Sequence, residues 1–325
     1  MILYQLKEKI KRLANRSPWS YRLFRRLRNG FAIMMSIVPD RPYAHWFYRT
    51  VTGKKLNLKT PTLFDDKMWW LKLHNRDPLL TTCSDKLAVR DYVTDAGCAN
   101  ILIPLRGSYA NARDVDFDGF AEEVILKCNM GSAEDFLFAS GGPQDNKHAR
   151  KHIRKALALA MKQKCHLFSR EWNYKNIRPR ILAEKLLRDK EGALPVDYRF
   201  FCFDGEPRIV ALDFGVLNAD GTHNPHYPRN IYDMDFTLLP VWETRANVGY
   251  PVQRPENFAR MVEIARALAA PFAFCRVDLY NLDGVIYFGE ITFYHGGGCN
   301  DFNPPEWDER LASWIPLDSE KVVLA

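Results

Sequence analysis

The sequence has little of what marks a secreted, membrane-spanning or disordered protein. Its seven cysteines are scattered over 325 residues and include no C-x-x-C pair, so we expect neither a disulfide framework nor a structural zinc site. The longest strongly apolar run, residues 31–38, is far shorter than the ~20 residues of a membrane-spanning helix. Glycine (18) and proline (19) are too rare for a linker-rich chain.

The amino terminus also lacks the order of a signal peptide, which is a basic start, an apolar core and a small-residue cleavage site. Together with the scattered cysteines, this absence predicts a reduced, cytoplasmic protein. What remains is an ordinary globular composition, with 47% hydrophobic and 26% charged residues, and a length typical of about two structural units.

Positive charge is concentrated at one end of the chain. Residues 1–60 hold fourteen Lys and Arg against only Glu8 and Asp40, a net +12, while the whole chain is +7. Such a segment could be a helical cap packed on the main domain, a contact with an anionic membrane surface or a contact with nucleic acid. No nucleic-acid-binding motif supports the third, so we expect no nucleic-acid partner. Apolar residues recur there at helical spacing: Leu3, Leu6, Ile10, Leu13, Leu23 and Leu27.

The rest of the chain predicts mixed α and β structure. Helices are expected over residues 84–97, 145–164 and 256–270, and single strands over 123–128 and 180–184. Two longer stretches, 197–211 and 274–292, have the strand–turn–strand pattern of hairpins. They turn at Asp204-Gly205 and Asp283-Gly284, dipeptides typical of two-residue hairpin turns.

Asp278 and Glu290 are the sharpest candidates for chemistry because both lie in apolar strands of the second hairpin. On one face, with Arg276 nearby, these carboxylates would hold Mg²⁺ while substrate phosphates complete its coordination shell. A strict two-residue turn pairs 282 with 285 and puts the carboxylates on opposite faces. A three-residue loop or one bulge brings them opposite each other, with Arg276 opposite Thr292. The metal hypothesis therefore assumes an irregular turn; the alternative is ordinary solvent-facing alternation with an Arg276–Glu290 ion pair.

Two other segments have polar groups suited to a nucleotide. Lys127 ends an apolar strand just before Gly131 and Ser132, and a lysine beside free backbone N–H groups suits a phosphate. A strand-end lysine that reaches for solvent has the same pattern. Residues 184–187 leave a strand and enter a connection, where exposed backbone groups could imitate base-pairing partners for an adenine.

Five phrases, taken together and in order, resemble a known family. They are Asp85-Lys86-Leu87-Ala88-Val89-Arg90, Leu126-Lys127-Cys128-Asn129, Arg170-Glu171-Trp172-Asn173-Tyr174, Asp197-Tyr198-Arg199-Phe200-x-Cys202-Phe203-Asp204-Gly205 and Tyr287-Phe288-Gly289-Glu290-Ile291-Thr292-Phe293. The set resembles the ATP-grasp superfamily, and more closely its TupA-like branch, named for teichuronopeptide synthesis and found among bacterial surface-polysaccharide genes. The similarity runs from about residue 57 to residue 317.

The resemblance implies an α+β fold in which two α+β subdomains of residues 76–325 clasp ATP, after a basic, mainly helical region of residues 1–75. It also implies site residues. Phosphate contacts would come from Lys86, Lys127 and Arg199, the covering loop from Gly131 and Ser132, and the adenine hinge from Glu184, Lys185 and Leu187. Mg²⁺ would bind Asp278, Glu290 and Thr292, and Arg276 would steady the transferred phosphoryl group.

One departure from the family pattern concerns the metal. Most ATP-grasp enzymes end the metal motif in Glu-x-Asn, whereas this chain has Glu290-Ile291-Thr292. A hydroxyl is a poorer magnesium ligand than an amide oxygen, so either two carboxylates and waters suffice or a second ion is loose. A second departure is the short, helical-looking amino-terminal region, which replaces a full α/β pre-domain.

The activity that the resemblance implies is ATP-dependent joining of a carboxylate to an amine through an acyl phosphate. The expected partners are a uronic-acid carboxylate of a surface polysaccharide or its lipid-linked precursor, and an amine or amino acid. Residues 1–60 would hold the enzyme at the inner face of the membrane. The alternatives are a glycosyltransferase that uses a nucleotide sugar, a kinase, and a non-catalytic membrane-associated adaptor. His295, beside three glycines, could contact substrate or serve its loop alone.

Overall fold

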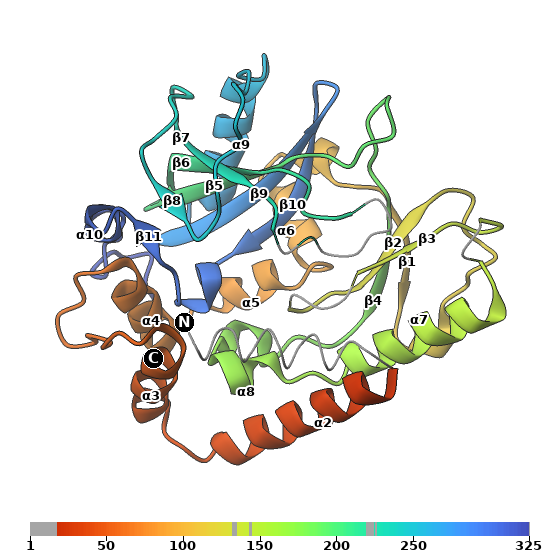
Figure 1. Cartoon of the computed structure of the whole chain (residues 1–325), viewed down its shortest axis with the longest axis horizontal. Helices are drawn as coiled ribbons and strands as arrows, with labels where there is room; N and C mark the ends of the chain where they lie inside the picture. The colour runs from red at the N-terminus through yellow and green to blue at the C-terminus, as the bar shows by residue number, and fades with distance from the viewer. Residues whose placement is uncertain (1–17, 132–134, 143–144, 219–223, 225, 325) are drawn as a thin grey trace.

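The computed structural model describes residues 18–131, 135–142, 145–218, 224 and 226–324. In these ranges the main features are two antiparallel sheets with helices packed around them, as Figure 1 shows. The smaller sheet has the order β1 (Leu105–Tyr109), β4 (Ile181–Lys185), β2 (Val124–Cys128), β3 (Phe136–Phe138). The larger has the order β10 (Val285–Thr292), β9 (Phe274–Leu282), β5 (Asp197–Phe203), β6 (Glu206–Asp213), β7 (Arg229–Asp233). The predicted mixture of helices, single strands and two hairpins is confirmed.

The smaller sheet is apolar on one face because its side chains alternate. Val124 and Leu126 are buried with Leu157 of helix α7 (Lys147–Ala160), in a separate hydrophobic cluster. Since neighbouring strand residues point to opposite faces, Lys127 and Glu184 lie on the other face. The register, which sets Lys127 opposite Leu182 and residue 125 opposite Glu184, puts these two charged groups side by side.

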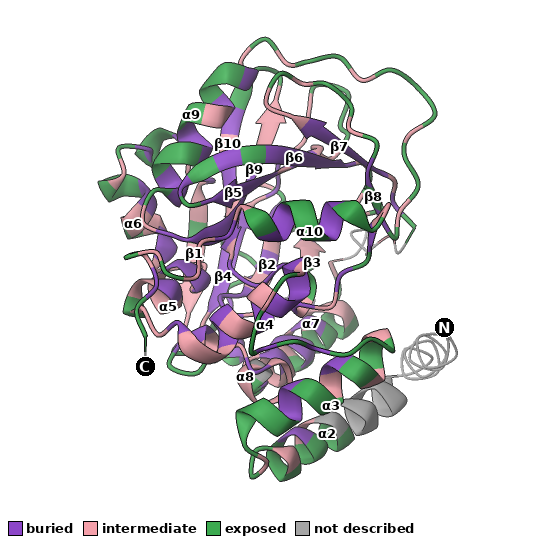
Figure 2. Ribbon diagram, turned by 90° about the vertical axis from the view of Figure 1, so that its left-hand side faces the viewer, coloured by how far each residue is buried: buried purple, intermediate pink, exposed green. Residues whose placement is uncertain are grey.

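The larger sheet also has one apolar and one polar face. Its apolar face packs on helix α9 (Phe258–Ala269), where Phe200 of β5 lies 5.9 Å from Phe258 between ring centroids. The central strands are buried on both sides, as Figure 2 shows. The opposite face therefore buries charged side chains, among them Asp213, Arg276 and Asp278, and buried charges need partners.

The predicted helix over residues 84–97 is wrong in its first turn: Ser84 ends a helix instead of starting one, and the helix in this range begins only at Val89. Ser84 ends α5 (Pro78–Ser84), and α6 (Val89–Asp95) begins five residues later. Between them Asp85 Oδ1 accepts the N–H of Leu87 at 2.8 Å, a side-chain turn that competes with helix continuation. The break puts Lys86 in a connection instead of a helix.

The amino-terminal helices pack on the main domain. They are α2 (Pro18–Met35) and α3 (Asp40–Thr52), and they lie near α8 (Cys165–Ser169) in Figure 1. Arg170 fixes them, because its Nη2 donates to the carbonyls of Met35 at 2.7 Å and Val38 at 3.0 Å and its guanidinium lies 4.1 Å over the Tyr43 ring. The helix expected over Leu23 and Leu27 is confirmed, whereas Leu3 to Leu13 lie outside the described residues.

Helix α4 (Phe64–His74) belongs to the main core, where Phe64 and Met68 pack. The division between residues 1–75 and 76–325 stays a prediction. The remaining elements are α10 (Glu306–Ser313), the paired strands β8 (Trp242–Glu243) and β11 (Phe302–Asn303), and short 3₁₀ helices at Ala99–Ile101, Ala112–Asp114, Trp172–Tyr174 and His295–Gly297. No helix in the described ranges is both long and apolar enough to cross a membrane.

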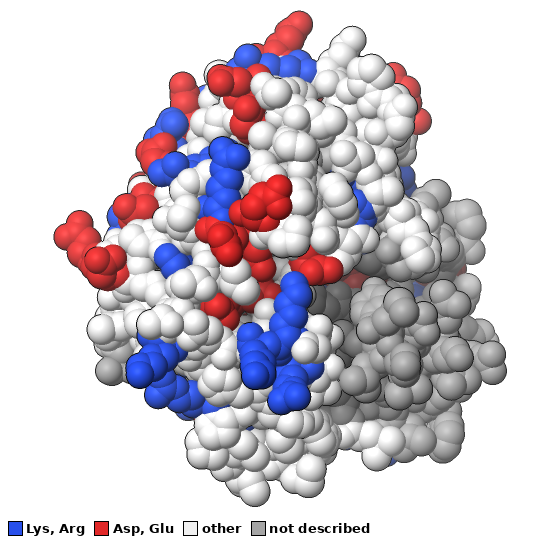
Figure 3. All heavy atoms as spheres, turned by 60° about the vertical axis from the view of Figure 1, so that its left-hand side comes forward, with Lys and Arg blue, Asp and Glu red and all other residues white. Residues whose placement is uncertain are grey.

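Charge is unevenly distributed over the surface. On the face shown in Figure 3, acidic and basic side chains lie together over the upper part, and below them the charged side chains in view are Lys and Arg. The described basic side chains of the amino-terminal region are exposed, including Arg26, Arg41 and Arg49.

Candidate active site

The second hairpin brings its two carboxylates together by a bulge. Its turn is a tight two-residue one, with φ of +51° at Asp283 and +85° at Gly284, and Leu282 pairs with Val285. The irregular turn that the metal hypothesis assumed is therefore wrong. Further along β10 the register shifts by one residue, so that Glu290 faces Asp278. The bulge alternative is confirmed, and it also sets residue 292 opposite residue 276, as predicted.

Gly289 is the residue that allows this bulge. A Cβ at this position would lie 3.0 Å from the carbonyl oxygen and 3.4 Å from the Cβ of Asp278. Any side chain there would push the neighbouring strand away. The glycine thus lets the β10 backbone approach β9 closely where the carboxylates must meet.

Arg276 lies at the centre of the resulting cluster. Its Nε and Nη2 each donate to a carboxylate oxygen of Asp278 at 2.6 Å, and Nη2 also reaches Glu290 at 3.3 Å and the Thr292 hydroxyl at 3.1 Å. The Arg276–Glu290 ion pair of the alternative interpretation is therefore present, but in a buried cluster: Arg276 is 6% exposed and Asp278 4%. A two-pronged pair of this kind fixes both partners.

Lys86 joins the cluster from the connection between α5 and α6. Its Nζ lies 2.8 Å from Glu290 Oε2. Burial raises the pKa of Glu290, but Lys86 and Arg276 outweigh it and hold that pKa well below its usual range. Burial lowers the pKa of Lys86, but Glu290 outweighs it, so the net shift is upward. Both groups are therefore charged at neutral pH.

Asn129 positions Lys86 next to the smaller sheet. The fully buried side chain of Asn129 donates to Asp85 Oδ1 at 2.8 Å and accepts the backbone N–H of Arg180 at 2.7 Å. The backbone carbonyl of Asn129 accepts the backbone N–H of Lys86 at 2.9 Å. It ties together three segments that are far apart in the sequence. Sequence reasoning gave it no role, although a polar residue directly after a buried strand was a usable signal.

Lys127 pairs with the predicted hinge residue Glu184. Lys127 Nζ lies 2.6 Å from Glu184 Oε2, and Arg90 lies 3.7 Å from the other oxygen. Glu184 is 5% exposed, and its charge also contributes to raising the pKa of Lys86. Glu184 therefore pairs with Lys127, and its charge also acts on Lys86, the other lysine predicted at the phosphates.

Arg199 lies on the polar face of the larger sheet, on strand β5, which borders β9 on the side opposite to β10 and Glu290. It lies directly opposite Asp278 in the β5–β9 register, and its Nε is 2.9 Å from Asp213. Arg229 holds Asp213 with two prongs at 2.5 and 2.7 Å. Sequence reasoning missed Asp213 and Arg229, because only the strand order places them beside Arg199.

His295 is buried behind Arg276. Arg276 Nη1 lies 2.8 Å from Nδ1 of the ring, and Nε2 lies 3.0 Å from Glu243. Since a guanidinium can only donate, Nδ1 accepts and the ring's proton is on Nε2, donated to Glu243. Burial lowers the pKa of His295 and Arg276 adds to this effect, which keeps the ring neutral. His295 therefore orients Arg276.

Helix α4 holds the glycine loop that carries His295. Asp65 accepts the backbone N–H of Asn300 at 2.9 Å and its side-chain amide at 2.7 Å. Trp69 and the buried Lys72 donate to two glycine carbonyls of residues 295–300, at 2.8 and 2.7 Å. The polar side chains of this buried helix therefore provide hydrogen-bond partners for backbone N–H and C=O groups of the loop.

The carboxylate pair fits a magnesium ion that arrives with phosphates. Mg²⁺ is commonly held by one or two carboxylates, with waters and substrate phosphates as its other ligands, and Asp278 and Glu290 face each other. The Thr292 hydroxyl lies 3.2 Å from Glu290. The described part of the chain has no group of three or more His, Cys, Asp or Glu that could hold a metal ion. The described residues therefore contain no metal site in which the protein alone supplies three such ligands.

The other predicted nucleotide residues stay predictions. Gly131 has a φ of +69°, and Ser132 lies outside the described residues. In the hinge, Lys185 donates its N–H to the Pro104 carbonyl at 3.0 Å, so that group is already used, and Leu187 is buried.

Comparisons with known proteins identify the family. The TupA-like ATP-grasp pattern matches residues 66–315, whereas no curated protein matches the chain. Among solved structures, the chain is similar to the D-alanine–D-alanine ligases of Bacillus anthracis, complexed with ATP (13% identity, TM-score 0.39), and Helicobacter pylori (12%, 0.42). The alignments cover 68% and 78% of this chain, and the chain spans 57% and 69% of theirs. A D-cycloserine synthetase is similar at 17% identity, with a TM-score of 0.43 and coverage of 74% of this chain and 72% of that one. Because the family pattern covers most of the chain, it confirms the predicted resemblance and the ATP-grasp fold: this chain belongs to the TupA-like ATP-grasp family.

Proposed function

We propose that the chain is an ATP- and Mg²⁺-dependent ligase that joins a carboxylate to an amine through an acyl phosphate. The observation that carries this proposal is the Gly289 bulge, which sets Asp278 and Glu290 on one face with Arg276 and Lys86 against them. Membership in an ATP-grasp family and the ligase-type fold support the same chemistry.

The proposed reaction has two displacement steps. An oxygen of the substrate carboxylate attacks the γ-phosphorus of ATP, the bond from that phosphorus to the β–γ bridging oxygen breaks, and ADP leaves. The amine nitrogen then attacks the carbonyl carbon of the acyl phosphate and loses a proton to solvent. The carbon–oxygen bond to phosphate breaks, so that phosphate leaves and an amide remains. No side chain of the protein has to act as a nucleophile.

The protein's part is to position reactants and offset negative charge. Lys86 and Lys127 would contact the phosphates, and Asp278 and Glu290 would hold Mg²⁺, with Thr292 beside them. When bound, the ion would neutralise charge on the phosphate oxygens. Arg276, held in place by His295, would steady the transferred phosphoryl group. The Lys86–Glu290 ion pair would have to open for Glu290 to hold a metal ion and for Lys86 to contact phosphate.

We propose a uronic-acid carboxylate of a surface glycan or of its lipid-linked precursor as the acceptor, and an amine or amino acid as co-substrate. The test is to incubate the protein with MgATP, glucuronate oligosaccharides and hydroxylamine, which converts an acyl phosphate to a stable hydroxamate. Hydroxamate and ADP in equal amounts support the ligase, and Asp278→Asn should abolish both.

Other outcomes would contradict the ligase. A stable phosphorylated sugar would indicate a kinase, and release of UDP from a UDP-sugar would indicate a glycosyltransferase. No nucleotide turnover with any acceptor, and no effect of Asp278→Asn on function in cells, would indicate an adaptor.

We further propose that α2 and α3 contact an anionic membrane surface. Leu27, Phe31 and Met34 are spaced as one stripe of α2 and are exposed, and Phe31 lies 6.3 Å from the exposed Trp46 of α3 between ring centroids. The two helices lie at the edge of the molecule in Figure 2. Arg26 of α2 and Arg41 and Arg49 of α3 are also exposed, and exposed apolar and basic side chains on the same helices are typical of helices that lie on anionic lipid.

Vesicle sedimentation tests this contact. Vesicles that contain phosphatidylglycerol should bind the protein, and vesicles of phosphatidylcholine alone should not. The double variant Phe31→Ser with Trp46→Ser should lose binding, and Leu238→Ser, at an exposed leucine elsewhere, should keep it. Equal sedimentation of both variants would contradict the proposal.

A further inference from the structure

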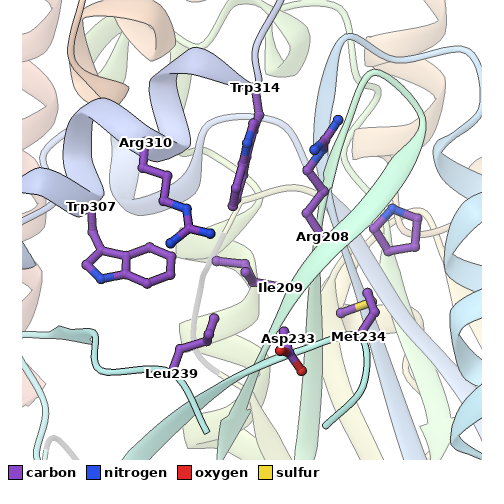
Figure 4. A pocket seen from close by; sticks show the side chains of 9 residues that line it. Arg208, Ile209, Asp233, Met234, Leu239, Trp307, Arg310 and Trp314 are labelled. Carbon is purple, nitrogen blue, oxygen red and sulfur yellow. The ribbon is translucent and has the colours of Figure 1, made fainter. Parts of the chain in front are cut away.

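A cavity of about 300 Å³ lies beside the larger sheet, outside the candidate active site. Helix α10 forms one wall and the strands β6 and β7 with their loops form the other, as Figure 4 shows. Its volume is at the lower limit of ligand sites, which run from about 300 to 1,000 Å³. The lining residues are Pro207, Arg208, Ile209, Asp233, Met234, Leu239, Trp307, Arg310 and Trp314.

The helix wall presents indole rings and a guanidinium. Trp307 and Arg310 are three residues apart, a spacing that puts them on one face of α10, and Trp314 follows directly after the last residue of the helix, four residues beyond Arg310. The Arg310 guanidinium lies 4.5 Å over the Trp307 ring and 5.5 Å from that of Trp314, and in Figure 4 it reaches between them. Stacking of this kind holds a guanidinium's plane while its N–H edges stay available.

A second guanidinium comes from a bulge in β6. The β5–β6 register shifts between Phe201 and Cys202, so that Pro207 and Ile209 have partners on β5 and Arg208 is the extra residue. Bulges re-aim side chains, and Arg208 lies 5.2 Å over the Trp314 ring. Among the described residues, the side chains of Arg208 and Arg310 form no ion pair with a carboxylate. Two arginines on one small cavity without such partners suit an anion.

The strand wall adds an apolar floor and one acceptor. Ile209, Met234 and Leu239 supply the floor. Asp233 Oδ1 already accepts two backbone N–H groups, from Asp235 at 3.0 Å and Thr237 at 2.8 Å, which leaves its second oxygen to accept from a hydroxyl. These groups together suit a pyranose ring that carries a carboxylate. The two guanidinium groups would bind the carboxylate, Asp233 would accept from a hydroxyl, and the apolar floor and the indole rings would pack against the ring.

We propose that this cavity binds one carboxylated sugar unit. The inference deepens the proposed function, on which it rests for the presence of an acidic glycan, by giving the acceptor chain a second point of attachment. A series of packed side chains joins the cavity to the candidate active site. Ile209 pairs with Phe201, and the Phe201 ring packs edge-on against His295 at 4.7 Å between centroids.

Titration calorimetry with D-glucuronate, and D-glucose as the neutral match, tests the cavity without nucleotide. Glucuronate should bind at least about tenfold more tightly than glucose, since a charge-assisted hydrogen bond contributes that much. Arg310→Gln should remove this preference, and Arg208→Lys, which keeps the charge but loses the planar fork, should weaken glucuronate binding. Arg266→Gln, at an exposed arginine on α9 paired with Glu206, is the control and should bind as the wild type does.

Three results would overturn the inference: equal binding of the two sugars, unchanged glucuronate binding by Arg310→Gln, and tighter binding of an acidic peptide than of glucuronate. Thermal melting of each variant checks that it folds. The titration contains no ATP, so its outcome is independent of the ligase assay. Glucuronate binding without hydroxamate formation would support the sugar site and contradict the ligase. Hydroxamate formation without glucuronate binding would support the ligase and contradict the sugar site.

Discussion

Replacement of Gly289 by alanine tests how the hairpin builds the site. The added methyl would lie 3.0 Å from the Asp278 carbonyl oxygen and 3.3 Å from the Tyr280 ring. Ordinary carbon contacts are about 3.5–4.0 Å, so β9 and β10 must separate by several tenths of an ångström. Backbone cannot yield as a flexible side chain can. We therefore expect a loss of about 1–3 kcal/mol in the free energy of unfolding, as for other overpacked sites.

The same displacement should harm nucleotide binding more than stability alone explains. Asp278 and Glu290 face each other only through this bulge, and Arg276 holds both carboxylates. Under the proposed function, a shift of Asp278 would break the alignment of the two carboxylates that are to hold Mg²⁺ with the phosphates. MgATP affinity of Gly289→Ala, measured by calorimetry at a temperature where the variant is fully folded, should fall at least about tenfold, which is about 1.4 kcal/mol.

Gly249→Ala is the matched control. Gly249 has open space where its Cβ would be, and its φ is not positive, so the alanine should leave stability and MgATP binding unchanged. Urea unfolding and calorimetry on the two variants decide the question. If Gly289→Ala binds MgATP as the wild type does, the bulge does not build the nucleotide site.

Further predictions concern residues around the site. Asn129→Ala should cost about 3 kcal/mol in urea unfolding, because it leaves buried partners unsatisfied, and should also weaken MgATP binding through Lys86. Arg170→Ala should free α2 and α3 for limited proteolysis while MgATP binding stays unchanged, since the Arg170 side chain makes its hydrogen bonds, ion pair and ring contact to residues 35–43. Burial raises the pKa of Asp197 to about 7. The folded state then binds more protons than the unfolded state between pH 4 and 7, so this group makes stability fall as pH rises through that window. In Asp197→Asn, the free energy of unfolding measured with urea should therefore decline less between pH 4 and 7 than in the wild type.

Local features of the site were predictable from the sequence because they depend on neighbouring residues. The Asp-Gly turns and the alternation of strand residues define the two hairpins and single out Asp278 and Glu290 as acids in apolar strands, of which Asp278 is buried and Glu290 is partly exposed. The bulge was only one of the options, since periodicity alone does not say where a register shifts. Gly289, a glycine inside a strand, was its signal.

Contacts between distant segments could not be predicted in this way. Arg229 forms ion pairs with both Asp213 and Glu243, and it does so only because β6 lies beside β7 and β8 lies close by. Lys86 was expected in a helix, but the Asp85 side chain interrupts that helix and frees it to reach Glu290. The cavity under α10 also needs the fold, because its two walls are about 70 to 100 residues apart in sequence.

Calorimetric titration with ATP tests the central claim most directly, which is that Asp278 and Glu290 jointly hold a divalent cation with the nucleotide. It should be carried out with Mg²⁺ and with EDTA on the wild type, Asp278→Asn and Glu290→Gln, with the exposed Glu206→Gln as control. We predict that wild type and control bind ATP tightly only with Mg²⁺, and that either site variant loses this dependence. ATP affinity that is the same with and without Mg²⁺, or unchanged in both site variants, would contradict the claim.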